Sequence, residues 1–171
     1  MSEYWDVFDE NRKPLNSTVK RGEHEFKKGE YHIVVTIVTM NMRGKLLCTL
    51  RSYEKPNYPD RWEMTAGSVL AGEDSLTAAK RELFEETGIK ADDDELKFIK
   101  SVREASAFVD CYFVRKNVDL SQIVLQDGET VAVKWVDRNE FKKMLAQKQF
   151  ANPVERRFFQ LKDFLVQQGF V

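Results

Sequence analysis

The pattern of hydrophobic and polar positions predicts strands first, then one helix, then further strands and two closing helices. Residues 32–40 are dense in β-branched side chains, residues 41–44 have the composition of a turn, and residues 45–51 are again mostly apolar. Such a pair of segments predicts a hairpin at the centre of a sheet. Further extended segments are expected at residues 63–69, 95–102, 108–114 and 130–136.

Residues 75–87 carry the clearest helical pattern in the chain. Leu76, Ala79, Leu83 and Thr87 recur at steps of three, four and four residues, which places them on one apolar stripe. Gly88 follows, and glycine is the residue that most often ends a helix. The sequence therefore predicts a helix over residues 75–87 that packs on the sheet through this stripe.

Two more helices are expected after the last strand. The first is predicted near residues 140–147 with Asn139 as its N-cap, and the second begins at Asn152 and Pro153, as cap and first position, and ends near Gly169. This order of elements predicts an α/β (α+β) fold in which a mixed β-sheet lies between helices. Residues 1–28 are polar and turn-rich, so we expect a short N-terminal β appendage there and one main domain over residues 29–171.

Composition narrows the classes of function. The chain has 171 residues and a formal net charge of −1, so it is expected to form one domain without a basic surface for generic nucleic acid binding. The beginning of the chain lacks an export signal and no apolar run is long enough for a membrane span, which predicts a cytoplasmic protein without membrane partners. Cys48 and Cys111 lie in strand-like segments and are expected to be buried free thiols, whereas His24 and His32 lack metal-ligand spacing and are interpreted as structural.

The candidate chemistry lies in residues 67–89, GSVLAGEDSLTAAKRELFEETGI. On a helix, Glu82, Glu85 and Glu86 fall within a sector about 100° wide, turned away from the apolar stripe. Clustered carboxylates are costly without a cation among them, and oxygen ligands without nearby histidine or cysteine suit Mg²⁺ or Mn²⁺. Arg81 stands four residues before Glu85 and can pair with it, while Gly67 permits backbone conformations that a side chain would forbid.

This segment resembles the Nudix box, G-x5-E-x7-R-E-U-x-E-E-x-G-U with U aliphatic, at every defined position. The resemblance implies an α/β/α sandwich and a metal-dependent hydrolase that cleaves the phosphoanhydride bond of a nucleoside diphosphate linked to another moiety. It also implies that Glu85 and Glu86 are the principal metal ligands, that Glu82 is a ligand or the general base, and that the Gly67 carbonyl completes the ligand set. Glu73 is expected to hold the loop.

Other residues are weaker candidates. Some family members take their base from a later loop, and Glu129 is the candidate for that role here. Arg51, at the end of a strand, is expected to bind substrate phosphate, with Lys55 as the weaker choice. Four aromatic residues could stack on a base, although packing is the more common role of such residues: Tyr53, Tyr58, Trp62 and Phe108.

Two alternatives to a hydrolase remain. The N-terminal appendage and residues 51–67 resemble the isopentenyl-diphosphate-isomerase-like branch of the family, but Ala66 stands near the place where isomerases carry a catalytic cysteine. A catalytically silent nucleotide-binding module would not need the three carboxylates. The expected partner is a small nucleoside diphosphate derivative; the sequence specifies neither the exact substrate nor the oligomeric state, and it leaves a homodimer open.

Overall fold

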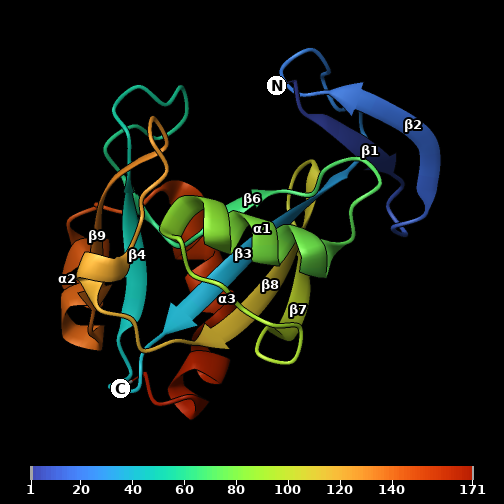
Figure 1. Cartoon of the computed structure of the whole chain (residues 1–171). Helices are drawn as coiled ribbons and strands as arrows, with labels where there is room; N and C mark the ends of the chain where they lie inside the picture. Colours follow the sequence, from blue (N-terminus) through green and yellow to red (C-terminus); the bar gives the residue numbers. More distant parts are fainter. Residues whose placement is uncertain (1, 171) are drawn as a thin grey trace.

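A mixed sheet of seven strands forms the centre of the computed structural model, which describes residues 2–170 (Figure 1). Its path runs β5-β4-β3-β8-β7, with β6 attached to β3 and β9 attached to β4, and β1 and β2 form a separate sheet. The strands are β1 (Tyr4–Phe8), β2 (Pro14–Lys20), β3 (His32–Met40), β4 (Leu46–Arg51), β5 (Trp62–Glu63), β6 (Ala66–Ser68), β7 (Lys97–Arg103), β8 (Ala107–Arg115) and β9 (Thr130–Val136). The helices are α1 (Ser75–Thr87), α2 (Arg138–Ala146) and α3 (Asn152–Gln167), with a 3-10 turn at Leu120–Gln122.

β3 is the central strand of this sheet, as its β-branched sequence predicts. It pairs in parallel with β8 along its whole length, from His32 opposite Ala107 to Met40 opposite Arg115. A strand that is covered on both faces needs apolar side chains on both, and eight of the nine residues of β3 are buried. β3 is therefore the strand around which the other strands of the sheet are arranged.

The predicted hairpin between residues 32–40 and 45–51 is confirmed only next to its turn. β3 and β4 share a single pair of residues, Met40 opposite Leu46, and then separate. β4 pairs instead with β9, while β6 occupies the edge of β3 that β4 leaves. The chain between β5, which pairs with β4, and β6, which pairs with β3, crosses from one strand to the other. The sheet is therefore split between β3 and β4.

Helices cover both faces of the sheet, which confirms the predicted sandwich (Figure 1). Ala79 and Leu83 of α1 pack with Val35 and Ile37 on one face. On the other face α2 and α3 pack against Val38 and the neighbouring strands, and Phe141 of α2 is fully buried there. The alternation of β3 side chains between the two faces thus supplies both cores.

The helix ends match the prediction for α1 and correct it for the other two helices. Asp74 caps the start of α1 and Gly88, with φ of 72°, ends it. α2 is capped by Asp137, whose side chain accepts a hydrogen bond from the Glu140 amide, and not by Asn139. The reason is that β9 ends at Val136, so the chain turns into the helix at once. The N-cap of α3 is Ala151, and Asn152 is already helical.

The N-terminal hairpin of β1 and β2 is attached to the main sheet at several points. The Trp5 ring stacks on His32 at the start of β3 with ring centroids 4.4 Å apart. The Tyr4 carbonyl accepts a hydrogen bond from Ala71, in the loop that leads into α1. The hairpin therefore holds the start of β3 and the loop before α1, while the division of the chain at residues 28 and 29 stays a prediction.

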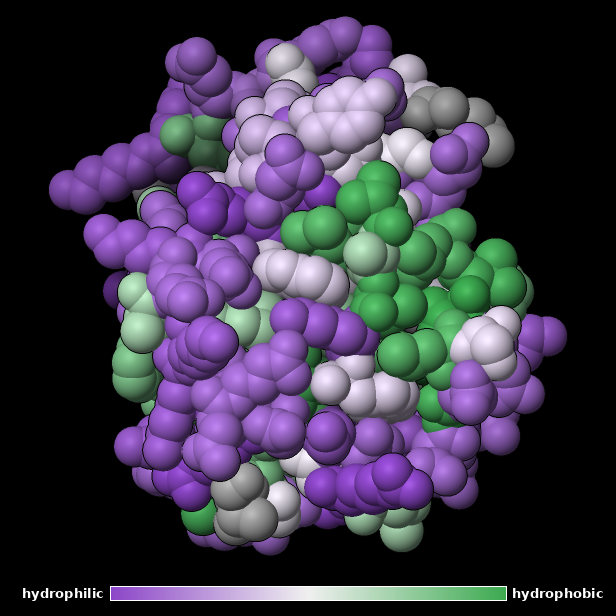
Figure 2. All heavy atoms as spheres, turned by 90° about the vertical axis from the view of Figure 1, so that its left-hand side faces the viewer, coloured by the Kyte–Doolittle hydropathy of each residue, from purple (hydrophilic) through white to green (hydrophobic). Residues whose placement is uncertain are grey.

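The surface that bears β4, β9 and α2 is mostly hydrophilic but carries one continuous hydrophobic area (Figure 2). Val124 and Val131 are among the exposed large hydrophobic residues of the molecule.

In the described part of the chain, no helix is both long and apolar enough to cross a membrane. The homodimer that the sequence leaves open stays untested.

Candidate active site

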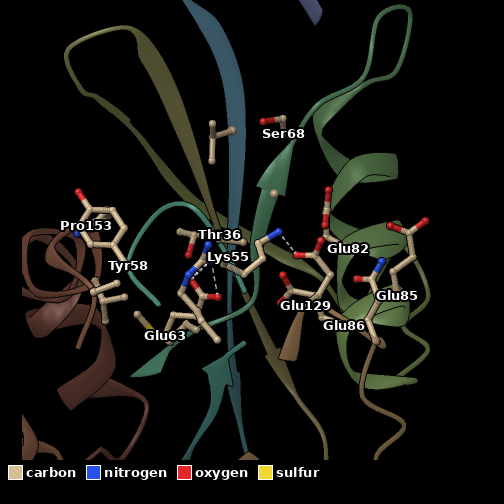
Figure 3. A pocket seen from close by; sticks show the side chains of 18 of the residues that line it. Thr36, Lys55, Tyr58, Glu63, Ser68, Glu82, Glu85, Glu86, Glu129 and Pro153 are labelled. Carbon is tan, nitrogen blue, oxygen red and sulfur yellow. Dashed lines mark hydrogen bonds and ion pairs between the residues drawn. The ribbon is translucent and has the colours of Figure 1, made fainter. Parts of the chain in front are cut away.

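A cleft of about 250 Å³ opens where β3 and β4 separate. Residues of β3 and β6 line it, and so do α1, the two loops at residues 52–61 and 125–129, and the start of α3. Figure 3 shows Glu82, Glu85 and Glu86 on α1 at one side, Tyr58 and Pro153 at the other, with Lys55 and Glu129 between. The split in the sheet thus brings the predicted site residues to one place.

The α1 wall of this cleft carries the three predicted carboxylates, but Arg81 stands among them. Its Nη1 atom lies 2.7 Å from Glu82 and 3.1 Å from Glu85, which confirms the predicted pairing with Glu85. Among residues 2–170, no three acidic, histidine or cysteine side chains form a ready-made metal site. Arg81 thus supplies a cation between Glu82 and Glu85, while Glu86 is not among its partners.

Glu73 holds Arg81 in this position, as the sequence predicts for a loop-holding residue. Both carboxylate oxygens of Glu73 accept hydrogen bonds of 2.9 Å from the Arg81 guanidinium group, and the Leu70 amide donates to Glu73 as well. The hydrogen bond to Glu73, together with that to Glu82, raises the pKa of Arg81. Arg81 is thus a fixed cation that joins the loop before α1 to the carboxylates.

Glu86 is the most deeply buried acidic group at the cleft, with only 6% of the residue exposed. Its Oε2 atom is buried and has no hydrogen-bond partner among the described residues. Burial raises the pKa of Glu86 well above its usual range, and the neighbouring charges of Glu63, Glu82 and Glu129 raise it further. A buried carboxylate oxygen without a partner is costly, so this atom needs a proton or a cation.

Gly67 lies against Glu82, and this contact explains the glycine in place of the predicted backbone freedom, while its carbonyl as a metal ligand stays a prediction. Its backbone has an ordinary φ within β6, so conformational freedom does not explain the glycine. A Cβ atom at this position would lie 1.9 Å from the Glu82 carboxyl carbon. Burial raises the pKa of Glu82, and the hydrogen bond from Arg81 opposes that shift. Gly67 therefore makes room for the Glu82 carboxylate.

Arg51, the predicted phosphate-binding residue, lies on the wall opposite α1. Its Nη1 atom donates to both oxygens of Glu63 at 2.8 and 3.0 Å, and its Nε atom donates to the Asn57 carbonyl. Nη2 has no such partner among the described residues, and the residue lines the cleft. The N–H groups of Arg51 Nη2 are thus available to a ligand.

Lys55 and Glu129, two of the weaker sequence candidates, form an ion pair that spans the two loops above the cleft (Figure 3). The Ser52 amide also donates to the Glu129 carbonyl, so backbone and side chains join the same loops. Glu129 is therefore close to Glu86, whose pKa its charge affects. Glu129 lines the same cleft as the carboxylates of α1, and its role as a base stays a prediction.

Two residues of the cleft were missed by sequence reasoning. Glu63 is buried, and burial raises its pKa although Arg51 opposes the shift. Arg157 of α3 is 9% exposed and pairs with Glu104. The only sequence signal for Arg157 is its place on the apolar face of α3, beside Val154 and Phe158, where a charge is unusual.

The remaining candidates lie mostly outside the cleft. Of the four aromatic residues, Tyr58 is the one found among the described residues that line it. Cys48 and Cys111 are buried and free as predicted, and burial raises their pKa values to about 12 and about 11. His32 packs against Trp5 within the hairpin contact, in agreement with a structural role.

Comparison with known proteins agrees with this geometry. The NUDIX domain family matches residues 30–160, and an uncharacterised Nudix hydrolase of Listeria innocua is 35% identical over 149 residues, which cover 86% of this chain and 88% of that protein. The chain therefore belongs to the Nudix family, and its enzyme class is that of the Nudix hydrolases. An isopentenyl-diphosphate Δ-isomerase of Pectobacterium atrosepticum is 40% identical over 85 residues, about half of each chain.

Solved structures support the same fold. DR0079 of Deinococcus radiodurans superposes with a TM-score of 0.72 over 87% of this chain and 92% of that chain, at 20% identity. A bifunctional NMN adenylyltransferase/ADP-ribose pyrophosphatase of Francisella tularensis, solved with AMP and a manganese ion, gives a TM-score of 0.66 over 79% of this chain and 42% of that chain, at 17% identity.

Proposed function

We propose that this protein is a Mg²⁺- or Mn²⁺-dependent pyrophosphohydrolase that acts on a nucleoside diphosphate linked to another moiety. The observation that carries the proposal is the buried Oε2 atom of Glu86, which lacks a partner among the described residues and belongs to a residue that lines the cleft. An oxygen donor in that state fits a hard divalent cation. The related pyrophosphatase of Francisella tularensis was solved with AMP and manganese, which is consistent with this ligand chemistry.

The charge of the cleft supports the same proposal. Six glutamates and five arginine or lysine residues line it, so its formal charge is −1. A diphosphate group adds at least two negative charges, and burying it there without a further cation would be unfavourable. Glu86, Glu85 and Glu82, with the Gly67 carbonyl, are the groups that would hold the ion. When bound, such an ion offsets the charge on the phosphate oxygens and on the leaving group.

The chain's own residues then have distinct tasks. Arg51 binds a phosphate oxygen through its free Nη2, and Arg81 keeps Glu82 and Glu85 in position through its hydrogen bonds. Either Glu82 or Glu129 accepts the proton of the attacking water. Glu129 can do so only after it leaves its ion pair with Lys55, so binding of a phosphate by Lys55 would free the Glu129 carboxylate.

A substrate panel with and without chelator tests the proposal. Nucleoside diphosphate sugars, ADP-ribose, dinucleotides and nucleoside triphosphates are incubated with the protein, and released nucleotide is measured by chromatography. Turnover is expected with Mg²⁺ or Mn²⁺, is expected to disappear with excess chelator, and is not expected to return with Ca²⁺ alone, because Mg²⁺ sites demand a stricter octahedral geometry. Undiminished turnover in chelator would contradict the metal mechanism.

Glu86→Gln provides the residue-level test. Loss of a ligand is expected to lower the rate about a thousandfold, since each 1.36 kcal/mol of barrier is about tenfold. The melting temperature without metal should stay equal or rise, because glutamine at this buried position needs neither a proton nor a cation to be neutral. The matched control is Glu95→Gln, at an exposed glutamate outside the cleft that pairs with Lys116. Near-native turnover of Glu86→Gln would show that this carboxylate is structural.

A further inference from the structure

Arg157 is a buried cation that enters the cleft from α3, on the side away from the α1 carboxylates. Only 9% of the residue is exposed, although it lies on a helix whose other buried positions are apolar: Val154, Phe158, Leu161 and Leu165. Burying an arginine costs desolvation energy unless its N–H groups have hydrogen-bond acceptors. The partners of each Arg157 nitrogen therefore indicate which donors are left for a ligand.

Glu104, in the turn between β7 and β8, fixes the guanidinium group of Arg157. Nε donates to one carboxylate oxygen at 3.0 Å and Nη2 donates to the other at 3.1 Å. This two-point contact sets the plane of the guanidinium group. Nη1 has no hydrogen-bond partner among the described residues, and since Arg157 lines the cleft, this nitrogen is the donor left for a ligand.

Two other cations, Arg51 and Lys55, line the same cleft as Arg157. The charges of Arg51, Lys55 and Arg157 all act on the same buried carboxylate, Glu63. Each of these cations has a carboxylate partner: Glu63 for Arg51, Glu129 for Lys55 and Glu104 for Arg157. This wall therefore offers hydrogen-bond donors without a net charge, and it lies across the cleft from the glutamates of α1. A ligand held between the two walls would direct its anionic oxygens toward Arg157 and its neighbours.

We propose that Arg157 binds a phosphate oxygen of the substrate through Nη1 and so fixes which phosphate of the diphosphate faces the α1 carboxylates. This inference rests on the proposed function, since it assumes a diphosphate ligand. Arg51 and Arg157 would approach the diphosphate from the end of β4 and from the start of α3. The cleft would therefore favour a substrate with two adjacent phosphate groups over one with a single phosphate.

Equilibrium binding of a probe that cannot be hydrolysed tests the assignment. Adenosine 5′-(α,β-methylene)diphosphate carries carbon in place of the bridging oxygen, and its dissociation constant with Mg²⁺ is measured by titration calorimetry on the full chain. Arg157→Met is expected to weaken binding about tenfold or more, as for a lost hydrogen bond to a charged group. The matched control is Arg156→Met, at the exposed neighbour on α3 that does not line the cleft, and a change of less than twofold is expected.

Arg157→Met leaves Glu104 without its partner and could lower stability. The double variant Arg157→Met with Glu104→Gln removes both charges, and it should show the same tenfold loss at a melting temperature close to that of the wild type. Mg²⁺ with inorganic pyrophosphate is the second probe. An equal loss for both probes is expected if Arg157 contacts phosphate, whereas a loss confined to the nucleotide would mean that Arg157 contacts the nucleoside and would overturn the inference.

The two proposals fail in different ways. If the wild-type protein binds neither the nucleotide analogue nor pyrophosphate, the proposed function is contradicted, and the Arg157 inference with it. If the wild type binds both probes and the folded Arg157 variants bind them within twofold of the wild type, only the Arg157 inference is overturned.

Discussion

Arg12, in the turn of the N-terminal hairpin, donates hydrogen bonds to both carboxylate oxygens of Asp110 on β8, at 2.7 and 2.5 Å. The two residues are 98 positions apart in the chain. Burial would raise the pKa of Asp110, but the hydrogen bond from Arg12 and others outweigh it and lower that pKa. The Asp110 side chain is 2% exposed and that of Arg12 is 34% exposed, so the pair lies at the edge of the core.

Arg12→Ala is therefore expected to destabilise the fold by about 2 to 3 kcal/mol, because it leaves Asp110 buried without its cation. Chemical denaturation of the variant and the wild type measures the difference. Lys13→Ala, at the exposed neighbouring residue, is the control and should change the free energy of unfolding by less than about 0.5 kcal/mol. Equal stability of Arg12→Ala and the wild type would show that the hairpin is not held by this contact.

Gly67→Ala is expected to abolish most activity while the protein still folds. The added methyl group would lie 1.9 Å from the Glu82 carboxyl carbon, so Glu82 must move away from its position beside Arg81. Displacement of a ligand or base typically costs several kcal/mol of barrier, so turnover should fall about a hundredfold or more. Rates on the substrate found in the panel, together with the melting temperature, measure the two effects.

Gly169→Ala is the contrasting variant for this prediction. Gly169 has φ of 93° and nothing within 4 Å of a Cβ, so its substitution strains the backbone without touching the cleft. We expect a loss of about 1 kcal/mol in stability and an unchanged turnover number. If Gly67→Ala behaved in the same way, with lower stability and full activity, the close approach of Gly67 to Glu82 would have no role in catalysis.

His32 should make stability depend on pH. Burial between Trp5 and Phe26, together with the charge of Arg21, lowers the pKa of His32 from 6.5 to about 4. Between those values the unfolded chain takes up a proton that the folded protein does not, so the free energy of unfolding falls as the pH decreases from about 6.5 to about 4. The loss amounts to about 3 kcal/mol when complete.

His32→Phe keeps an aromatic ring in the stack and removes the titration. The difference in unfolding free energy between wild type and variant is expected to be constant above pH 7.5 and to shift in favour of the variant by about 3 kcal/mol as the pH reaches 4. Urea denaturation across this range measures it. Parallel pH profiles of the two proteins would mean that His32 becomes protonated in the folded state.

The isomerase alternative can be tested with isopentenyl diphosphate. Ala66, which lines the cleft, stands near the sequence position at which isomerases carry a catalytic cysteine, and both cysteines of this chain are buried and absent from the described lining. No allylic isomer is therefore expected when the protein is incubated with isopentenyl diphosphate and Mg²⁺, with an active isomerase as positive control. Isomer formation above the uncatalysed rate would show that the chain is an isomerase and not a hydrolase.

Local features of the fold could be predicted because they depend on neighbouring residues. Residues 130–136 were predicted as a strand and form β9 at those bounds, and α1 begins and ends where its apolar stripe and Gly88 predict. The carboxylates and Arg81 could be placed on one side of α1 for the same reason, since three- and four-residue steps determine the face of a helix.

Contacts between distant segments could not be predicted in this way. Nothing in the residues around Lys55 shows that Glu129 will neutralise it, or that Glu104 will turn Arg157 toward the cleft. The prediction that Asn139 caps α2 was wrong because two acceptable cap residues stand close together, and the end of β9 determines which one is used. Ion-pair partners and the first residues of helices depend on how the sheet arranges segments that are distant in the sequence.

The single residue pair that joins β3 to β4 has a consequence for how such an enzyme can change over evolutionary time. The carboxylate-bearing helix packs on the half of the sheet that contains β3, while Arg51 and Lys55 belong to β4 and the loop that follows it. The two halves are not independent, since Leu47 of β4 packs in the same cluster as Ala79 and Leu83 of α1, but no residue of the loop after β4 belongs to that cluster. We therefore expect a change of substrate to arise most readily through the loop after β4, while the carboxylates of α1 are inherited unchanged.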